Sequence, residues 1–295
     1  MPKVTPQRPI PISKSDPRTV NGQAVPGIVN RIAPIGFDEE EGLKMLVYGR
    51  SGTGKTTFWA TFPKPILAII SSGGNQSGEL RSIDTPEYRK TIHQVALQES
   101  EELEEILTWL RGQEGKYRTL VLDHASGFQD LLLQEILGLE EGTLLQKNWG
   151  LASREQYGQV TVRFRKHLHD LLRIQQHVVV VAQEREFSAE DNQELLAPYV
   201  GASLQPSIAR WLNTAVDYVV QTFLREGAVE KKIKIGPNKF KTIQRKGGKV
   251  EFCLRTAPDP VYYAKFRTPR RSAREIPACI VDPSYEKIRS LIKPE

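Results

Sequence analysis

The amino-acid sequence predicts an α/β fold whose central sheet is mostly parallel and is extended by an antiparallel β meander in the C-terminal part of the chain. Between residues 43 and 182, short apolar runs alternate with segments of helical spacing, the pattern of a parallel sheet covered by helices on both sides. The run Val178-Val179-Val180-Val181 fits a strand buried on both faces. After Asp217, short β-like runs are separated by glycine and proline turns, which is typical of antiparallel strands.

The elements follow from the spacing of apolar residues. In chain order we expect strands at 43–48, 66–70, 91–97, 119–122 and 177–182, and helices at 55–62, 100–109, 127–137 and 154–176. Ser100 is the expected N-cap of its helix, because a serine side chain accepts a hydrogen bond from a free N–H group. The runs of the meander are 218–223, 231–235, 240–244, 250–254 and 262–266, with Gly227 and Gly247-Gly248 among their separators.

The composition changes along the chain. Residues 1–36 are rich in proline and poor in apolar periodicity, so we expect a flexible N-terminal arm. Residues 37–224 hold the α/β core, and residues 225–295 form a basic, β-rich extension of the same domain. The whole chain has a net charge of +6, but residues 225–275 alone carry 15 Lys and Arg against 5 Asp and Glu. Such a block indicates contact with phosphates, whether of a nucleic acid or of a neighbour's nucleotide, or else a solvated sheet face.

Composition also argues against several classes of protein. The sequence has no run of 18 apolar residues, so we expect no transmembrane helix. The first residues lack the apolar centre of a signal peptide, and we therefore expect a cytoplasmic protein without a membrane partner. Cys253 and Cys279 are too few for a disulfide framework or a zinc site, and the five histidines have no metal-ligand spacing.

The strongest motif follows the first predicted strand and reads Gly49-Arg50-Ser51-Gly52-Thr53-Gly54-Lys55-Thr56. Its glycines allow successive backbone N–H groups to converge on phosphate oxygens, and the N-terminus of the next helix points at the same place. Lys55 supplies a positive charge for the β- and γ-phosphates. The Thr56 hydroxyl is a candidate Mg²⁺ ligand, with Thr57 as a neighbouring hydroxyl. The motif therefore predicts a P-loop that binds ATP or GTP.

Two later strands end in polar residues that suit the same site. Asp123 follows the apolar run Thr119–Leu122, where a carboxylate can hold a Mg²⁺-bound water beside the P-loop. Gln183 ends the strand that contains the valine run. It is a candidate sensor of the γ-phosphate or of the attacking water, or alternatively an amide that faces solvent.

Together these residues resemble the RecA superfamily, and within it the compact phage nucleotide-binding proteins with a RecA-like core that act in recombination and single-strand annealing. The resemblance covers residues 43–290, and its matching segments are Met45–Thr57, Leu120–Asp123, Val178–Glu184 and Tyr263–Arg267. It implies ATP and Mg²⁺ as cofactors, single-stranded DNA as a partner, a homo-oligomeric ring or filament, and a bacterial or phage-infected host cell.

The last of these segments looks like the Lys-x-Arg element of RecA relatives, which in many of them reaches a neighbouring subunit's nucleotide. Residues two apart on a strand face the same way, so Lys265 and Arg267 would project together. The resemblance implies that Lys265 binds the nucleotide and that Arg267 is an arginine finger delivered in trans. The alternative is two exposed cations in a basic tail.

The sequence departs from the family at the residue that polarises the attacking water. Ser72 occupies the place of the expected glutamate, and a serine is a poor base near neutral pH. Glu79, Asp123 or Glu184 are candidate substitutes. Hydrolysis is therefore expected to be slow, or the protein mainly binds ATP.

The segments that match the two DNA-contacting loops of RecA differ in charge. The second, residues 184–203, is acidic and should repel phosphates, whereas the first, residues 138–157, carries Lys147, Trp149, Arg154 and Tyr157. Cations beside aromatic rings suit a single strand whose bases stack, unless those rings pack in the core. We therefore expect an ATPase that acts on single-stranded DNA in recombination or annealing. The alternative is an ATP-binding switch with a protein partner; a helicase motor or a metabolic kinase is less supported.

Overall fold

A computed structural model describes residues 19–20, 23–24, 42–71, 80–113, 115–138, 152–188, 198–236, 239–268 and 276–292. The chain divides into two compact units, residues 1–40 and 41–295. In the first unit, β1 (Thr19–Val20) pairs antiparallel with β2 (Gln23–Ala24). No helix in these described ranges is both long and apolar enough to cross a lipid bilayer.

The second unit contains the α/β core. Its strands are β3 (Lys44–Gly49), β4 (Ile66–Ile70), β5 (Ile92–Ala96), β6 (Thr119–Asp123), β7 (His177–Phe187), β8 (Tyr199–Ala202), β9 (Tyr218–Gly236), β10 (Lys239–Arg255), β11 (Lys265–Phe266) and β12 (Cys279–Val281). Its helices are α1 (Lys55–Trp59), the short 3₁₀ helix η2 (Arg81–Ile83), α3 (Tyr88–Thr91), α4 (Glu102–Arg111), α5 (Ala125–Leu137), α6 (Arg154–Leu172), α7 (Pro206–Ala215) and α8 (Tyr285–Ile292).

The described strands of this unit form one 10-stranded sheet, with the order β12-β10-β9-β3-β7-β6-β4-β5 and with β11 and β8 paired to β9 and β7. Strands from β9 to β5 in this order run parallel, whereas β10 and β12 are antiparallel to their neighbours. Every residue of β3, β4 and β6 is buried, as expected for strands covered on both faces. The predicted fold class, a mostly parallel α/β sheet with antiparallel strands from the C-terminal part, is confirmed.

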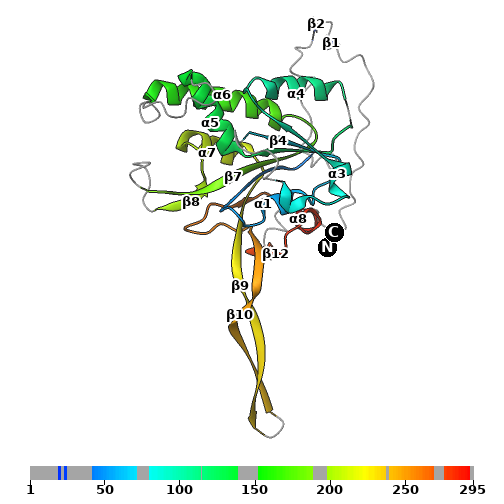
Figure 1. The fold of residues 1–295 in the computed structure, drawn as a ribbon, viewed down its shortest axis with the longest axis vertical. Coiled ribbons are helices and arrows are strands. Elements are labelled where there is room, and N and C mark those ends of the chain that lie inside the picture. The colour runs from blue at the N-terminus through cyan, green and yellow to red at the C-terminus, as the bar shows by residue number, and fades with distance from the viewer. Residues whose placement is uncertain are drawn as a thin grey trace, which may run out of the picture. The chain divides into compact units, whose positions relative to one another are not determined.

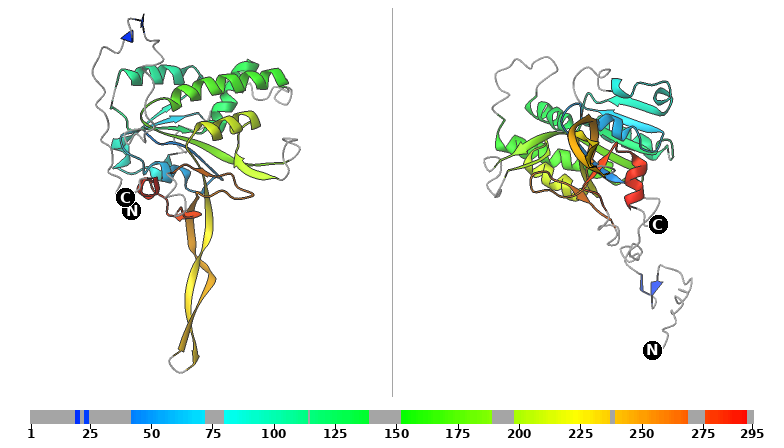
Figure 2. Two further views of the ribbon diagram at one scale, coloured as in Figure 1. Left: turned by 180° about the vertical axis from the view of Figure 1, so that it is seen from behind. Right: turned by 90° about the horizontal axis from the view of Figure 1, so that it is seen from below.

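Helices cover both faces of this sheet (Figures 1 and 2). On one face α4, α5, α6 and α7 pack in a single apolar core, which includes Leu107, Phe128 and Phe164. On the other face α1 and α8 share a second core, which includes Trp59 and Ile288. Because β3, β7 and β6 are adjacent and parallel, the segments following their carboxyl ends lie at one edge of the sheet.

The meander takes a different form from the expected series of short strands. β9 and β10 are two long strands paired from Gln221↔Arg255 to Gly236↔Lys239, and they extend from the sheet as a hairpin arm (Figure 1). Gly227 and Gly247-Gly248, which we expected to separate short strands, lie within β9 and β10. A Cβ added to Gly248 would lie 2.6 Å from the carbonyl oxygen of Gly227, so the two backbones approach too closely for a side chain. The register shifts here, between Lys246 and Val250, which marks a β-bulge.

Two local expectations were also wrong. The first helix, α1, ends at Trp59 rather than at residue 62. Ser100 does not cap α4, whose N-cap is Glu101 without a side-chain hydrogen bond. Ser100 lies one residue before that cap, and its hydroxyl instead donates to Glu135 Oε2 at 2.6 Å and to Glu101 Oε2 at 3.0 Å, both charged acceptors.

A buried histidine joins β7 to the start of β3 and to α8. His177 Nδ1 accepts the Leu43 N–H at 2.9 Å, and its ring packs edge-on against Phe62 and Tyr285. Burial lowers the pKa of His177 to about 4, and the positive charge of Lys44 adds to that effect. The folded protein therefore holds this imidazole in its neutral form at neutral pH.

We expect the free energy of unfolding to fall as the pH is lowered from about 6.5 towards 4, since the unfolded chain binds a proton at His177 that the folded chain excludes. Above the pKa of His177 in the unfolded chain, this residue adds no pH dependence to the free energy of unfolding. Below it, the slope due to His177 is at most about 1.4 kcal/mol per pH unit. The variant His177→Asn keeps an acceptor for the Leu43 N–H but cannot titrate. Urea unfolding at about pH 7 and about pH 5 should show a smaller loss in this variant than in the wild type; equal losses would assign the effect to other groups.

Candidate nucleotide-binding site

The P-loop leaves the carboxyl end of β3 and enters α1. Gly52 and Gly54 have φ angles of 79° and 87°, in the left-handed region that glycine adopts without strain. At Gly49 the constraint is space, because an added Cβ would lie 2.4 Å from the carbonyl oxygen of Thr222 on β9. The glycines of the motif therefore shape the loop and let it pack against the neighbouring strand.

The loop presents backbone donors that have no partner in the part of the chain that the structure describes. α1 has no side-chain cap, and no hydrogen bond within the described residues uses the N–H groups of Gly52, Gly54, Lys55 and Thr56. Arg50, Ser51 and Gly52 are exposed, and the Thr56 hydroxyl makes no hydrogen bond in the same described ranges. Converging N–H groups of this kind suit the oxygens of a phosphate chain.

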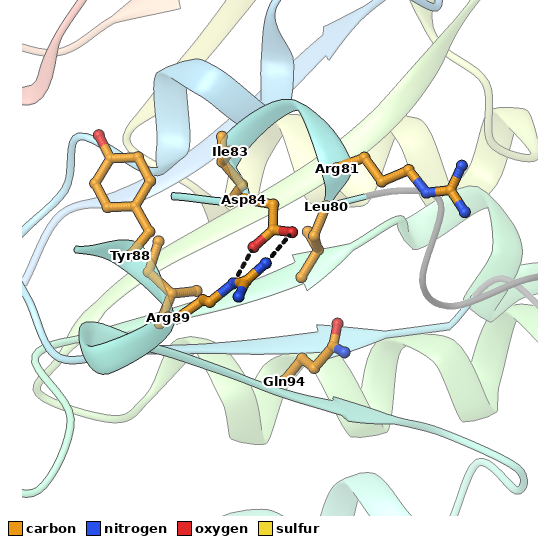
Figure 3. A pocket seen from close by; sticks show the side chains of 8 residues that line it. Leu80, Arg81, Ile83, Asp84, Tyr88, Arg89 and Gln94 are labelled. Carbon is orange, nitrogen blue, oxygen red and sulfur yellow. Dashed lines mark hydrogen bonds and ion pairs between the residues drawn. The ribbon is translucent and has the colours of Figure 1, made fainter. Parts of the chain in front are cut away.

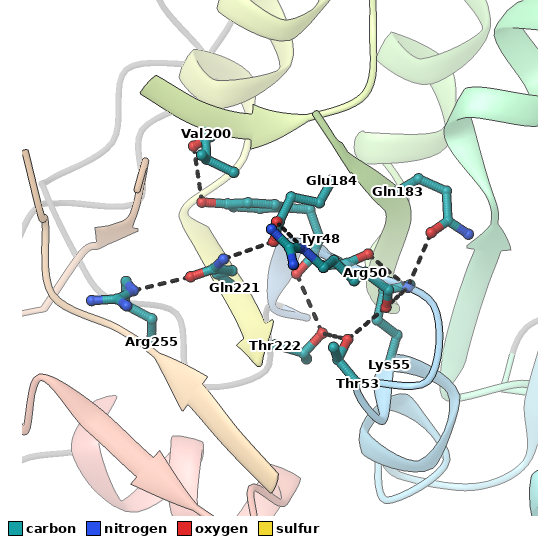
Figure 4. A network of polar contacts seen from close by, with 11 residues as sticks. Tyr48, Arg50, Thr53, Lys55, Gln183, Glu184, Val200, Gln221, Thr222 and Arg255 are labelled. Carbon is teal, nitrogen blue, oxygen red and sulfur yellow. Dashed lines mark hydrogen bonds and ion pairs between the residues drawn. The ribbon is translucent and has the colours of Figure 1, made fainter. Parts of the chain in front are cut away.

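Lys55 lies inside the loop rather than in solvent. Its Nζ donates to the carbonyl oxygens of Gly49 and Arg50, both at 2.8 Å, and to Gln183 Oε1 at 3.4 Å (Figure 4). The residue is only 9% exposed. Burial lowers the pKa of Lys55, and the negative charges of Asp123 and Glu184 oppose that shift. The predicted lysine and the predicted sensor glutamine are therefore in contact, although they are far apart in sequence.

Asp123 ends β6, the second strand along from β3, and is 7% exposed. Its Oδ2 accepts the Trp59 Nε1–H at 3.0 Å, which ties the carboxylate to α1. In the described residues no cluster of three or more His, Cys, Asp and Glu could hold a metal alone. A Mg²⁺ ion here would instead use the Thr56 hydroxyl, Asp123 directly or through water, and phosphate oxygens, which is the usual pattern for this cation. The residues present fit a nucleotide with Mg²⁺.

A chain of side-chain contacts connects the loop to β9 and β10 (Figure 4). Arg50 Nε is 3.0 Å from Glu184 Oε1, and Glu184 Oε2 accepts Gln221 Nε2 at 2.8 Å. Gln221 Oε1 in turn accepts Arg255 Nε at 3.0 Å. Beside this chain, the Thr53 and Thr222 hydroxyls are 2.7 Å apart.

Sequence reasoning did not identify Gln221, Thr222 or Arg255 as part of the site. The one signal was two polar residues inside an otherwise apolar run at 218–223. Their role depends on β9 pairing with β3, in the register Tyr48↔Gln221, which a single sequence does not reveal.

Lys265 and Arg267 lie near the amino ends of β3 and β9, whereas the P-loop follows the carboxyl end of β3. Lys265 is on β11, and its Nζ donates to the carbonyl oxygens at the end of α7, including Val216 O at 2.6 Å. Arg267 Nη1 is 2.9 Å from Asp217 Oδ1, and its side chain is 57% exposed. β11 pairs with Tyr218, which pairs with Met45 at the start of β3. The structure does not bring these two cations to the P-loop of the same chain.

Several other expected contacts are only partly described. Ser72, Glu79, Lys147 and Trp149 lie outside the described residues. Of the first DNA-contacting segment, Arg154 and Tyr157 are in the first turn of α6, where Tyr157 is 41% exposed. The second segment continues β7 into a hairpin with β8.

A separate pocket lies beside the edge strand β5 (Figure 3). Two of its charged groups are paired with each other, since Arg89 Nε and Nη2 lie 2.6 and 2.8 Å from the two carboxylate oxygens of Asp84, and Arg81 also lines the pocket. Tyr88 and Ile92 form part of its apolar wall. The pocket shares no residue with the P-loop site.

A family model described as an AAA domain, AAA_24, matches residues 41–268. No curated protein matches the sequence. Similar solved structures include the flagellar accessory protein FlaH from Methanocaldococcus jannaschii, with 9% identity, a TM-score of 0.36, and coverage of 73% of this chain and 77% of that chain. They also include the KaiC-like protein PH0186 from Pyrococcus horikoshii OT3, with 14% identity, a TM-score of 0.34, and coverage of 72% and 85%. Because the family match spans most of the chain and contains the P-loop, the protein belongs to the AAA_24 family of AAA domains.

Proposed function

We propose that this P-loop protein binds ATP with Mg²⁺ and acts as a RecA-like oligomer on single-stranded DNA in recombination or annealing, as in the phage proteins it resembles. The observation that carries the nucleotide part is the position of Lys55, in contact with Gln183 and inside a loop whose N–H groups include four with no partner among the described residues. Lys55 would neutralise the β- and γ-phosphates, and Thr56 and Asp123 would hold Mg²⁺. Gln183 would respond to the terminal phosphate.

The basic hairpin arm supports a nucleic-acid partner. Between residues 228 and 246 the sequence carries seven Lys and Arg and a single acidic residue, Glu230. These residues lie on the two long strands β9 and β10, which also contribute Gln221, Thr222 and Arg255 to the P-loop site. A charged ribbon joined directly to a nucleotide site suits a protein that neutralises DNA phosphates in response to ATP.

The position of Arg267 supports an oligomer with sites between subunits. Met45, level with β11, is four residues before Gly49, so Arg267 lies roughly 13 Å or more along the sheet from the P-loop. Any nucleotide that Arg267 contacts would therefore belong to another copy. A repeated head-to-tail contact of this kind generates a ring or a filament.

One observation favours the alternative, an ATP-binding switch that recognises a protein and hydrolyses little. The Glu184 side chain is 8% exposed and is held by both Arg50 and Gln221. The Asp123 carboxylate is held by Trp59. Asp123 and Glu184, the two described candidates for the missing catalytic base, therefore already accept hydrogen bonds from other side chains. This supports slow hydrolysis of ATP.

The variant Lys55→Ala should keep its fold but lose ATP affinity by roughly 10- to 100-fold, because a charge-assisted contact with the phosphates is removed. Isothermal titration with Mg·ATP measures this loss. Lys166→Ala is the matched control, since Lys166 is 65% exposed on α6 and pairs only with Glu104 among its described contacts. An unchanged ATP affinity in folded Lys55→Ala would refute the P-loop assignment.

ATP turnover should rise when single-stranded DNA is added at low salt, and this stimulation should fade at high salt as counterions compete for phosphates. A variant in which an Asn-Gly turn replaces residues 229–245 joins Ala228 to Lys246, which face each other across the hairpin. This variant should keep its basal turnover and lose the stimulation. Lys55→Ala provides the blank, and a wild type with no response to DNA at any salt concentration would favour the protein-partner switch.

Arg267→Ala should leave ATP binding nearly unchanged and abolish the turnover that depends on assembly. The matched control is Asp217→Ala, which removes the same ion pair but retains the arginine. Turnover is measured across a range of protein concentrations for both variants. If the two variants lose activity equally, the ion pair matters rather than an arginine acting in trans.

A further inference from the structure

An exposed apolar surface adjoins the P-loop at the base of the hairpin arm. Leu224 and Phe252 are each 44% exposed and face each other across β9 and β10. Val250, two residues before Phe252, is 62% exposed and lies on the same face. We call these three residues the apolar shelf.

The apolar shelf is continuous with the wall of the P-loop. A Cβ built on Gly54 would lie 3.0 Å from Cδ1 and 3.6 Å from Cε1 of Phe252, so the edge of the ring touches the loop directly. Thr222, two residues before Leu224 on the same face of β9, is hydrogen-bonded to Thr53. The apolar shelf therefore directly adjoins the C-terminal part of the P-loop.

The polarity of the site gives the direction in which a bound nucleotide extends. Lys55, Gln183 and Asp123 mark the terminal-phosphate end, and the last two are on β7 and β6. β9 and β10 lie on the opposite side of β3 in the sheet. A nucleotide whose γ-phosphate points towards β7 and β6 extends its ribose and base towards β9 and β10, where the apolar shelf is exposed.

We propose that the apolar shelf binds the base of the nucleoside triphosphate, with the Phe252 ring stacking on the base and Leu224 and Val250 extending the contact. This proposal rests on the nucleotide assignment above and adds the base subsite to it. Every base has a π face, so an aromatic ring recognises it without reading its hydrogen-bonding edge. A flat, half-exposed ring touching the phosphate loop has the chemistry that such a contact needs, and purines should bind more tightly than pyrimidines because they stack over a larger area.

The test compares two probes that share phosphates but differ in the base. Mg·ATP and inorganic tripolyphosphate are titrated separately into wild type, Phe252→Ala and Phe252→Tyr. We expect Phe252→Ala to weaken ATP binding about tenfold and to leave tripolyphosphate binding unchanged, while Phe252→Tyr retains wild-type affinity for both. Val162→Ala is the matched control, since Val162 is a 69% exposed aliphatic residue on α6.

Each other outcome is distinct. A wild type that binds neither probe sinks the P-loop assignment and this proposal with it. Equal weakening of both probes in Phe252→Ala means that the ring supports the loop rather than the base. Unchanged ATP affinity in that variant overturns the proposal, and a change confined to the oligomeric state in sedimentation assigns the shelf instead to an interface between copies. If Phe252→Ala does not fold, Leu224→Ala is compared in the same way, and unaltered ATP binding there overturns the proposal.

Discussion

The packing of β9 against β3 is the constraint on which the site depends. Gly49 approaches the Thr222 backbone so closely that no side chain fits, and Thr53 shares a hydrogen bond with the Thr222 hydroxyl. The P-loop is therefore held on one side by a strand that begins more than 160 residues later in the chain, with Tyr218. Helix α1 and Asp123 hold it on the other side through Trp59. Both supports are formed only when the whole sheet is assembled, so the loop conformation is a product of tertiary structure.

Charge compensation is the second organising element. A buried lysine is costly unless opposite charges or hydrogen-bond acceptors surround it. Lys55 has two carbonyl oxygens and an amide oxygen as acceptors, with Asp123 and Glu184 nearby. Glu184 is balanced in turn by Arg50. The phosphate site is thus polar on the β7 side, in contrast to the exposed apolar surface on the β10 side.

The sequence was sufficient for the features that depend on local pattern. The P-loop, the buried strands and Asp123 are each read from adjacent residues, because glycine conformation and apolar runs are local properties. The hairpin arm was misread because Gly227 and Gly248, normally turn residues, here allow two strands to approach at a bulge. The contacts of Glu184, Gln221 and Arg255 depend on the order of the strands in the sheet, which cannot be inferred from the local pattern of a single sequence. Likewise, nothing local to Lys265 showed that it caps α7.

The hairpin arm places its tip far from the P-loop to which its base is attached. β9 runs without interruption from Thr222, in contact with the P-loop, to Gly236, a distance of roughly 46 Å at about 3.3 Å per residue. For a rigid ribbon of that length, a rotation of about 5° at Thr222 would displace the far end by about 4 Å, on the basis of the same rise per residue. The geometry of the arm would thus convert a small rearrangement of the loop into a larger displacement at the tip, provided that the bulge between Lys246 and Val250 transmits the rotation.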